Sequence, residues 1–174
     1  DPTGGYRNRT FVVSPLVDDP LSQDSSYDKV FLPGIEKIFT TSGRDDRLVV
    51  ESHVDQSRLG FTTCYAYLFT ELPRQYAFED GVDAIVQIAS WRGASSREYS
   101  MMNVRTDLYY GKLWDVVLAA ASAQNQVWTI ACNAVGQHGV TGEAFWGGSG
   151  VWAPSGIRLV QASHFLEELL IVRN

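Results

Sequence analysis

The sequence contains little of what marks several classes of protein. It has only two cysteines, Cys64 and Cys132, which are too few for a disulfide-stapled secreted domain, so we expect reduced thiols and a cytoplasmic location. No apolar run approaches the length of a membrane span, and the first residues lack the apolar core of a signal peptide. The three histidines are scattered without metal-ligand spacing, so we expect no metal site.

Positive charge is also scarce. The 14 Lys and Arg against 20 Asp and Glu give a formal net charge of −6, which disfavours binding to nucleic acids and to acidic membrane surfaces. No segment repeats with the period of a solenoid or an array. What is present is typical of a globular protein, with 45% apolar and 12% aromatic residues in a chain of 174. We therefore expect residues 1–174 to form a single domain with a buried core.

Short β-branched and aromatic segments alternate with helical patterns along the chain. The clearest helix is 112–125, where an apolar stripe recurs with helical spacing, and a second helix is predicted at 71–79. Strands are predicted at 9–17, 27–32, 48–51, 59–65, 84–89, 127–131, 150–153, 157–161 and 166–172. The strands at 48–51 and 59–65 could pair as a hairpin, and Pro154-Ser155-Gly156 would turn the chain between 150–153 and 157–161. This alternation predicts an α/β fold.

Three further residues or segments have a structural prediction. Cys132 lies inside a predicted strand and is interpreted as a core residue. The run Gly147–Gly150 lacks the lysine of a phosphate-binding loop and is interpreted as a tight hairpin. Cys64 ends the apolar strand RLGFTTC and precedes the helix at 71–79, where helix-end amides would lower the pKa of a thiol and make it nucleophilic. From position alone, a small core residue is the more common role for such a cysteine.

Several segments resemble the nitrilase, or carbon-nitrogen hydrolase, superfamily, in matching order and spacing over nearly the whole chain. The segment YDKVFL at 27–32 is similar to the family's Tyr-x-Lys-x-x-Leu motif, and LGFTTCYAYLFTE at 59–71 is similar to its nucleophile strand. The remaining similarities are NRTFVV at 8–13, ASAQN at 121–125, NAVG at 133–136 and GGSGVWAPSG at 147–156.

The resemblance implies a cysteine hydrolase of non-peptide carbon-nitrogen bonds that needs no cofactor. Its substrates would be small amides, nitriles or N-carbamoyl compounds. Cys64 would attack the substrate carbon, Lys29 would stabilise the charge that develops, and Glu36 would orient Lys29 and the attacking water. Without the resemblance, Lys29 is an ordinary solvated cation and Glu36 a loop carboxylate.

Three more residues are implied to contact the substrate. The backbone N–H of Tyr65, next to the nucleophile, would be a second donor to the developing negative charge. Ser90 and Trp91 directly follow the strand predicted at 84–89, whose end faces the pocket in the family. The competing interpretation of Trp91 is an ordinary buried indole.

The family fold is a four-layer αββα sandwich, and the resemblance implies that this chain covers roughly its C-terminal part. The family's general-base glutamate would then precede Asp1, so activity of the chain by itself is uncertain. Half a sandwich leaves an apolar sheet face uncovered. We therefore expect association, either with the missing N-terminal half or as a homo-oligomer.

Two alternatives to hydrolysis stay open. A non-catalytic nitrilase-like binding or oligomerisation module is favoured by Ala66, which stands where the family usually has Asp, and by the general base that is missing from the sequence. An acyltransferase would use the same covalent intermediate and pass the acyl group to an amine instead of water.

Overall fold

The structure is a computed structural model that describes residues 5–15, 18, 22, 24–44, 47–93, 97–99, 101, 104–106 and 109–172. By its internal contacts the chain divides into two compact units, residues 1–87 and residues 88–174, and each is described by itself. That residues 1–174 form one domain stays a prediction.

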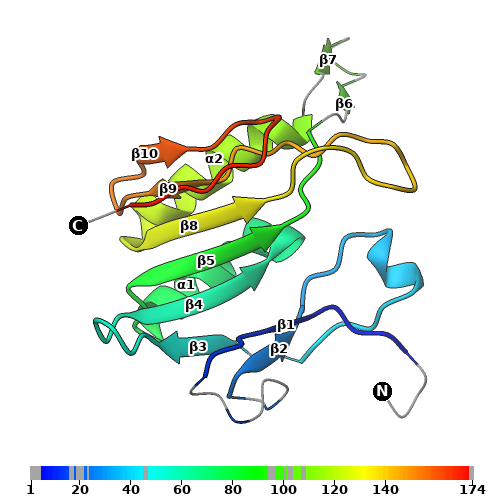
Figure 1. Ribbon diagram of the computed structural model, residues 1–174. Helices are drawn as coiled ribbons and strands as arrows, with labels where there is room; N and C mark the ends of the chain where they lie inside the picture. The colour runs from blue at the N-terminus through cyan, green and yellow to red at the C-terminus, as the bar shows by residue number, and fades with distance from the viewer. Residues whose placement is uncertain are drawn as a thin grey trace. The chain divides into compact units, whose positions relative to one another are not determined.

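The first unit is built from short strands, one α-helix and two 3₁₀-helices (Figure 1). Its elements are β1 (Arg9–Phe11), β2 (Ser26–Asp28), η1 (Glu36–Ile38), β3 (Leu48–Glu51), β4 (Arg58–Thr63), η2 (Cys64–Leu68), α1 (Glu71–Phe78) and β5 (Ala84–Ala89), of which the unit includes all but the last two residues. β1 pairs with β2, and β3 pairs with β4, both antiparallel. β5 is the other neighbour of β4, and Figure 1 shows the two arrows pointing the same way, so β4, α1 and β5 form a strand–helix–strand crossover.

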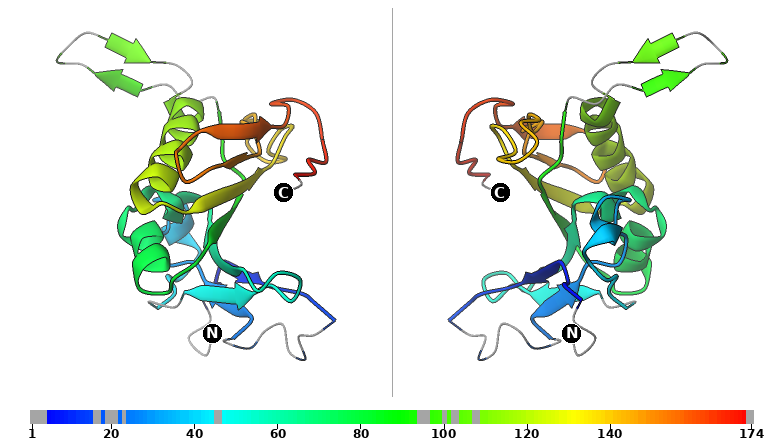
Figure 2. Two further views of the ribbon diagram at one scale, coloured as in Figure 1. Left: turned by 90° about the vertical axis from the view of Figure 1, so that its left-hand side faces the viewer. Right: turned by 90° about the vertical axis from the view of Figure 1, so that its right-hand side faces the viewer.

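Tyr76 of α1 joins the helix to the strands of this unit. Its ring is fully buried, and its hydroxyl accepts a hydrogen bond from the N–H of Leu48 at 3.1 Å and donates one to the carbonyl of Phe61 at 2.6 Å. Gly60 of β4 leaves room for the ring, because a Cβ there would lie 2.6 Å from Cδ1 of Tyr76. The helix therefore packs closely along one face of β4 (Figure 2).

The second unit has one long helix over an antiparallel group of strands. Its elements are β6 (Arg97–Tyr99), β7 (Val104–Thr106), α2 (Tyr109–Asn125), β8 (Trp128–Asn133), β9 (Gly150–Trp152) and β10 (Arg158–Gln161). β9 pairs antiparallel with both β8 and β10. α2 buries Trp114, Leu118 and Ser122, and the Ser122 hydroxyl donates to Oγ1 of Thr129 in β8 at 2.7 Å. α2 therefore covers one face of β8 and β9 (Figure 2).

The other face of β8 is open within this unit. Burial alternates along the strand: Thr129 and Ala131 are buried, whereas Trp128, Ile130 and Cys132 are exposed. The prediction of Cys132 as a core residue is therefore wrong, because the two-residue period of the strand places it with Trp128 and Ile130 on the open face. An open apolar face agrees with the expectation from the sequence, and association of that face with a partner stays a prediction.

Most of the predicted elements occur, and the α/β class is confirmed. The helices at 71–79 and 112–125 correspond to α1 and α2, and the hairpin of β3 and β4 forms as expected. The strands predicted at 9–17 and 27–32 are shorter, at 9–11 and 26–28, and β6 and β7 were not predicted. The strand predicted at 166–172 is wrong: these residues form no strand, and most of their apolar side chains are strongly exposed.

The glycine run before β9 also differs from its prediction. The chain turns between β9 and β10 at Pro154-Ser155-Gly156, as expected, where the N–H of Gly156 donates to the carbonyl of Ala153 at 2.8 Å. Gly147 and Gly148 form a connection that leads into β9 and have φ of 60° and 63°. His164 packs against both, since a Cβ on Gly147 would lie 2.7 Å from its Cα. The run therefore permits a close approach of His164 and is not the hairpin turn.

Candidate active site

Cys64 lies where the chain leaves β4 and begins η2. Thr63 before it is extended, with φ −121° and ψ 110°, whereas Cys64 itself has φ +50°. Side chains other than glycine rarely adopt this left-handed backbone, and residues held in it often belong to functional sites. The cysteine is not part of a disulfide and is partly exposed. Cys64 thus stands at a sharp change of chain direction, and the residue is not fully buried.

The helix that follows Cys64 differs from the prediction in one respect. The α-helix expected at 71–79 is present as α1, but Cys64 is followed first by the 3₁₀-helix η2. The α-helical dipole that was expected to act on the thiol therefore begins seven residues later, at Glu71. Stabilisation of a Cys64 thiolate would therefore have to come from groups other than this helix.

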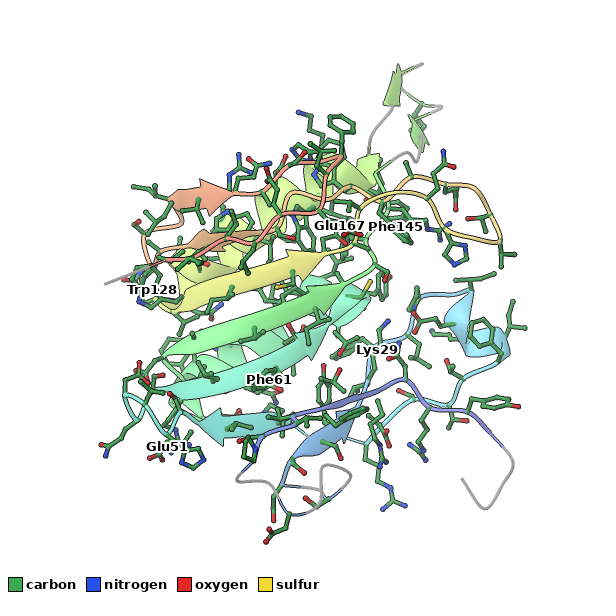
Figure 3. The ribbon with its side chains drawn as sticks, in the orientation of Figure 1. Lys29, Glu51, Phe61, Trp128, Phe145 and Glu167 are labelled. Atoms are coloured by element: carbon green, nitrogen blue, oxygen red, sulfur yellow. The ribbon has the colours of Figure 1, made fainter. Side chains whose placement is uncertain are left out.

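Lys29 and Glu36 are brought together by the structure. Lys29 follows β2 and its side chain is completely buried, while Glu36 begins η1 and its side chain is 21% exposed. Nζ of Lys29, a residue labelled in Figure 3, donates to both carboxylate oxygens of Glu36, at 2.8 and 2.9 Å. A buried ammonium is costly unless it is paired, and the Glu36 carboxylate provides the pairing for Lys29 inside the unit.

A row of hydroxyl groups connects the Lys29 segment to the Cys64 strand. The Tyr27 hydroxyl lies 2.6 Å from Oγ1 of Thr63, which in turn lies 2.7 Å from Oγ1 of Thr10. Tyr27 stands two residues before Lys29, and Thr63 directly precedes Cys64. The segments that carry Lys29 and Cys64 are therefore side by side at this point. Burial raises the pKa of Tyr27 to about 12, so its hydroxyl is neutral at physiological pH.

Arginines in and next to β1 form ion pairs with Asp28 at the end of β2. Arg9 donates to the two carboxylate oxygens of Asp28 at 2.7 and 3.0 Å, and Arg7 approaches the same carboxylate at 3.4 Å. The hydrogen bond from Arg9 holds the pKa of Asp28 below its usual value of 3.8. Because Asp28 and Lys29 are neighbours, this ion pair fixes the strand end from which the Lys29 side chain starts.

Gln87 contacts the Cys64 backbone and was not predicted from the sequence. It is fully buried in β5, donates from Nε2 to the carbonyl of Cys64 at 2.8 Å, and accepts at Oε1 from the Thr62 hydroxyl at 2.6 Å. The signal for it was available: a glutamine stands in the apolar run AIVQIA, between Ile85 and Ala89 on the buried face. Buried amides are almost always hydrogen-bonded, so such a residue has a fixed partner.

The remaining predicted site residues are described within their own units. Tyr65 is part of η2, and its ring meets Phe69 edge-on at 5.4 Å. In the second unit Ser90 is exposed, whereas Trp91 is 4% exposed and its indole N–H donates to the carbonyl of Tyr110 at 2.7 Å. Contact of Ser90 or Trp91 with a substrate stays a prediction, and the buried indole agrees with the competing interpretation of Trp91.

A cavity of about 310 Å³ lies elsewhere in the second unit. It is lined by Asn133, Ser149 and residues 162–168 among others, and by none of the predicted site residues. Two of the polar lining side chains are hydrogen-bonded within the protein: the Asn133 amide donates to the carbonyls of Trp91 and Gly147, and the Ser149 hydroxyl accepts from the N–H of Asn133 at 2.9 Å. We assign no function to this cavity.

Among the residues that the structure describes, no group of three or more His, Cys, Asp or Glu is placed to hold a metal ion. In the same part of the chain, no helix has both the length and the apolar character needed to cross a bilayer.

Comparison with known proteins gives one family. The family model described as carbon-nitrogen hydrolase matches residues 5–173. A comparison with curated proteins gives no match.

Solved structures of the nitrilase superfamily are similar to this fold. A mutant of the amidase from Nesterenkonia sp. AN1, which shows the result of Michael addition of acrylamide at the active site cysteine, is 24% identical with a TM-score of 0.65, over 80% of this chain and 48% of that one. A CN-hydrolase superfamily protein from Xanthomonas campestris with an arsenic adduct in the active site is 25% identical with a TM-score of 0.66, over 82% and 49%. A branch 10 member of the nitrilase superfamily from Saccharomyces cerevisiae is 19% identical with a TM-score of 0.70, over 95% and 52%. The chain thus spans about half the length of these relatives.

Proposed function

Because this chain belongs to the carbon-nitrogen hydrolase family, we propose that it carries the nucleophile and the charge-stabilising lysine of a cysteine hydrolase. The substrates are small amides, nitriles or N-carbamoyl compounds. Cys64 is the nucleophile, Lys29 stabilises developing negative charge, and Glu36 orients Lys29 and the attacking water. This assignment follows the motifs of the sequence.

One observation carries the proposal. The hydrogen bond between Tyr27 and Thr63, at 2.6 Å, links the segment that leads to Lys29 with the strand that ends at Cys64. A hydrolase of this kind needs a thiolate that attacks the substrate carbon and a cation that stabilises the negative charge on the atom bonded to that carbon. Residues 35 positions apart in the sequence are thus supported as members of one site. The left-handed backbone of Cys64 and the paired, buried Lys29 add to this support.

The reaction on an amide proceeds through a thioester. The Cys64 thiolate attacks the carbonyl carbon, a carbon–sulfur bond forms, and the carbonyl π electrons move to oxygen, where Lys29 and the N–H of Tyr65 stabilise the charge. When the adduct collapses, the carbon–nitrogen bond breaks, and the nitrogen takes a proton and leaves as ammonia or an amine. Water then attacks the thioester, which releases the carboxylic acid and restores the thiol.

Proton transfer needs a general base, which is worth roughly 10²–10⁴ in rate. The proposal assigns no base within residues 1–174, since the resemblance places the family's glutamate before Asp1. Turnover should therefore be measured on the protein in its natural form.

Alkylation of the two cysteines tests the proposal. With iodoacetamide at neutral pH and intact-mass detection, we expect Cys64 to react at least about tenfold faster than Cys132, since a reactive thiolate forms only in a supporting environment. Cys132 is a demanding control because it is the more exposed of the two thiols. The variants Cys64→Ala and Cys132→Ala assign each adduct. Equal rates, or faster labelling of Cys132, would overturn the proposal and favour a non-catalytic binding or oligomerisation module.

A transferase remains the second candidate, because it shares the thioester. Adding hydroxylamine to an amide reaction distinguishes the two: a hydrolase releases mainly the acid, whereas a transferase diverts most of the acyl group to the hydroxamate. The general acyl-enzyme mechanism predicts both products, so their ratio decides.

We also propose that the chain associates through the open face of β8, on which Trp128, Ile130 and Cys132 are exposed. A partner that covers these side chains removes apolar surface from water. Light scattering should give a mass well above 19.3 kDa, and a stable monomer would contradict this. We also propose a reducing, cytoplasmic setting, which the absence of a disulfide at Cys64 and Cys132 supports and a native disulfide would contradict.

A further inference from the structure

Gln87 holds the carbonyl group of the predicted nucleophile in place. Its side-chain amide is fully buried between the Cys64 carbonyl, 2.8 Å from Nε2, and the Thr62 hydroxyl, 2.6 Å from Oε1. A carbonyl oxygen only accepts hydrogen bonds, so the orientation of the amide is fixed: nitrogen faces Cys64 and oxygen faces Thr62. Thr62 is itself fully buried, which leaves the amide no competing water.

The same contact fixes the direction of a second group. The carbonyl of Cys64 and the N–H of Tyr65 belong to one planar trans peptide unit, so they point in opposite directions. Tyr65 is the second residue of η2, and the first N–H groups of a helical segment have no partner within that segment. A residue that grips the carbonyl from one side therefore aims the N–H of Tyr65 to the other side.

The backbone at Cys64 needs such support. With φ of +50° it is in a region that a cysteine rarely adopts, and a return of this φ to negative values would move the carbonyl of Cys64. Strained residues persist only when the surrounding structure holds them. The buried Gln87 amide is a rigid donor on the strand next to β4, and it is suited to this task.

We propose that Gln87 is a positioning residue that locks the 64–65 peptide, and thereby aims the N–H of Tyr65 at the oxygen on which negative charge develops. The proposal rests on the proposed function, in which Cys64 is the nucleophile and Tyr65 N–H a charge-stabilising donor. Thr62 donates a hydrogen bond to Gln87 and therefore acts on the 64–65 peptide only through Gln87.

Two variants test this role. Gln87→Met keeps nearly the size of the side chain and removes its donor. We expect kcat for a small aliphatic amide to fall about 10- to 100-fold with KM unchanged within about threefold, because loss of a charge-stabilising donor acts mainly on the transition state. Alkylation of Cys64 by iodoacetamide should change much less, because that displacement develops no oxyanion. Thr62→Val should produce the same pattern more weakly.

Thr129→Val is the matched control. It makes the same substitution at another fully buried threonine, whose hydroxyl accepts a hydrogen bond from that of Ser122 within the second unit. We expect a loss of stability with unchanged kcat. If Thr62→Val and Thr129→Val affect kcat equally, or if Gln87→Met keeps wild-type kcat, the positioning role is overturned.

Failure of the proposed function gives a different result. In that case wild-type Cys64 is alkylated no faster than Cys132, and amide turnover is absent in every variant. Crystal structures of wild type and Gln87→Met then decide the positioning role alone. A rotated 64–65 peptide in the variant supports it, and an unchanged peptide overturns it.

Discussion

The Lys29 ammonium lies 2.8 and 2.9 Å from the two carboxylate oxygens of Glu36, and the Lys29 side chain is fully buried while that of Glu36 is 21% exposed. The pair is therefore asymmetric: one charge depends entirely on its partner, whereas the other retains contact with water. Removing the carboxylate should cost more than the pair contributes, since it leaves a buried cation without compensation.

This asymmetry predicts a double-mutant result. Glu36→Ala should destabilise the protein by about 2–3 kcal/mol, and Lys29→Met in the same chain should restore most of that loss. Activity should be absent in the double variant, because the stabilising charge is gone. Urea unfolding of the single and double variants gives the free energies. Asp115→Ala breaks the half-exposed pair with Arg158 and should cost less than about 1 kcal/mol. A double variant no more stable than Glu36→Ala would contradict the argument.

The left-handed backbone of Cys64 predicts an unusual effect of glycine. At φ +50°, Cys64→Gly should be about 1 kcal/mol more stable than Cys64→Ala, because glycine has no Cβ to strain. At Cys132, inside β8, the order should reverse, and Gly should be less stable than Ala by about 0.5–1 kcal/mol. Thermal unfolding of the four variants measures both differences. If the Ala variant is more stable than the Gly variant at Cys64 as well as at Cys132, then Cys64 carries no backbone strain.

The pKa of Tyr27 predicts a loss of stability in alkali. Burial raises this pKa from 10.0 to about 12, so the folded state keeps a proton that the unfolded state has already released. Stability is therefore fully present below pH 10 and declines between pH 10 and 12, by up to about 1.4 kcal/mol per pH unit for one group. Tyr27→Phe should be less stable at pH 8 but should lose less stability above pH 10. Urea unfolding of the wild type and of Tyr27→Phe at pH 8 and above pH 10 tests this. Equal losses of unfolding free energy in the two proteins would contradict it.

The contact between Gly60 and Tyr76 predicts overpacking. A methyl group on Gly60 would lie 2.6 Å from the Tyr76 ring, so Gly60→Ala should cost about 1–3 kcal/mol. Gly34→Ala is a suitable control, because a Cβ there would have nothing within 4 Å and its backbone is not left-handed. Equal unfolding midpoints for the two variants would mean that the ring shifts without cost.

The sequence predicted the regular parts of the fold well because they depend on local pattern. The apolar stripe of α2 and the β-branched runs of β3 and β4 are visible in the sequence alone. Residues 166–172 have the same apolar composition, but a strand also needs a neighbour to pair with, and composition does not reveal one. The error at Cys132 has a similar origin, since the pattern identifies two faces of a strand without showing which one is covered.

The candidate site depended on the resemblance more than on pattern. Cys64, Lys29 and Glu36 were identified from motifs, and the ion pair of Lys29 with Glu36 was not readable from their seven-residue spacing. Gln87 was not predicted because its side chain carries no nucleophilic or titratable group. A glutamine within an apolar strand nevertheless indicates a buried amide with a fixed hydrogen-bond partner. The burial of Trp91 follows from packing on Trp114 and Tyr110, which the sequence places far apart.

The three hydroxyls of Tyr27, Thr63 and Thr10 form a line in which each oxygen can give away a single proton. While the phenol is neutral it can donate toward Thr63. Once it ionises it can only accept, so the threonine hydroxyls have to turn toward it. Alkali therefore fixes one direction for this row, in which Thr63 donates to the phenolate and Thr10 donates to Thr63, and the change reaches the residue immediately before Cys64.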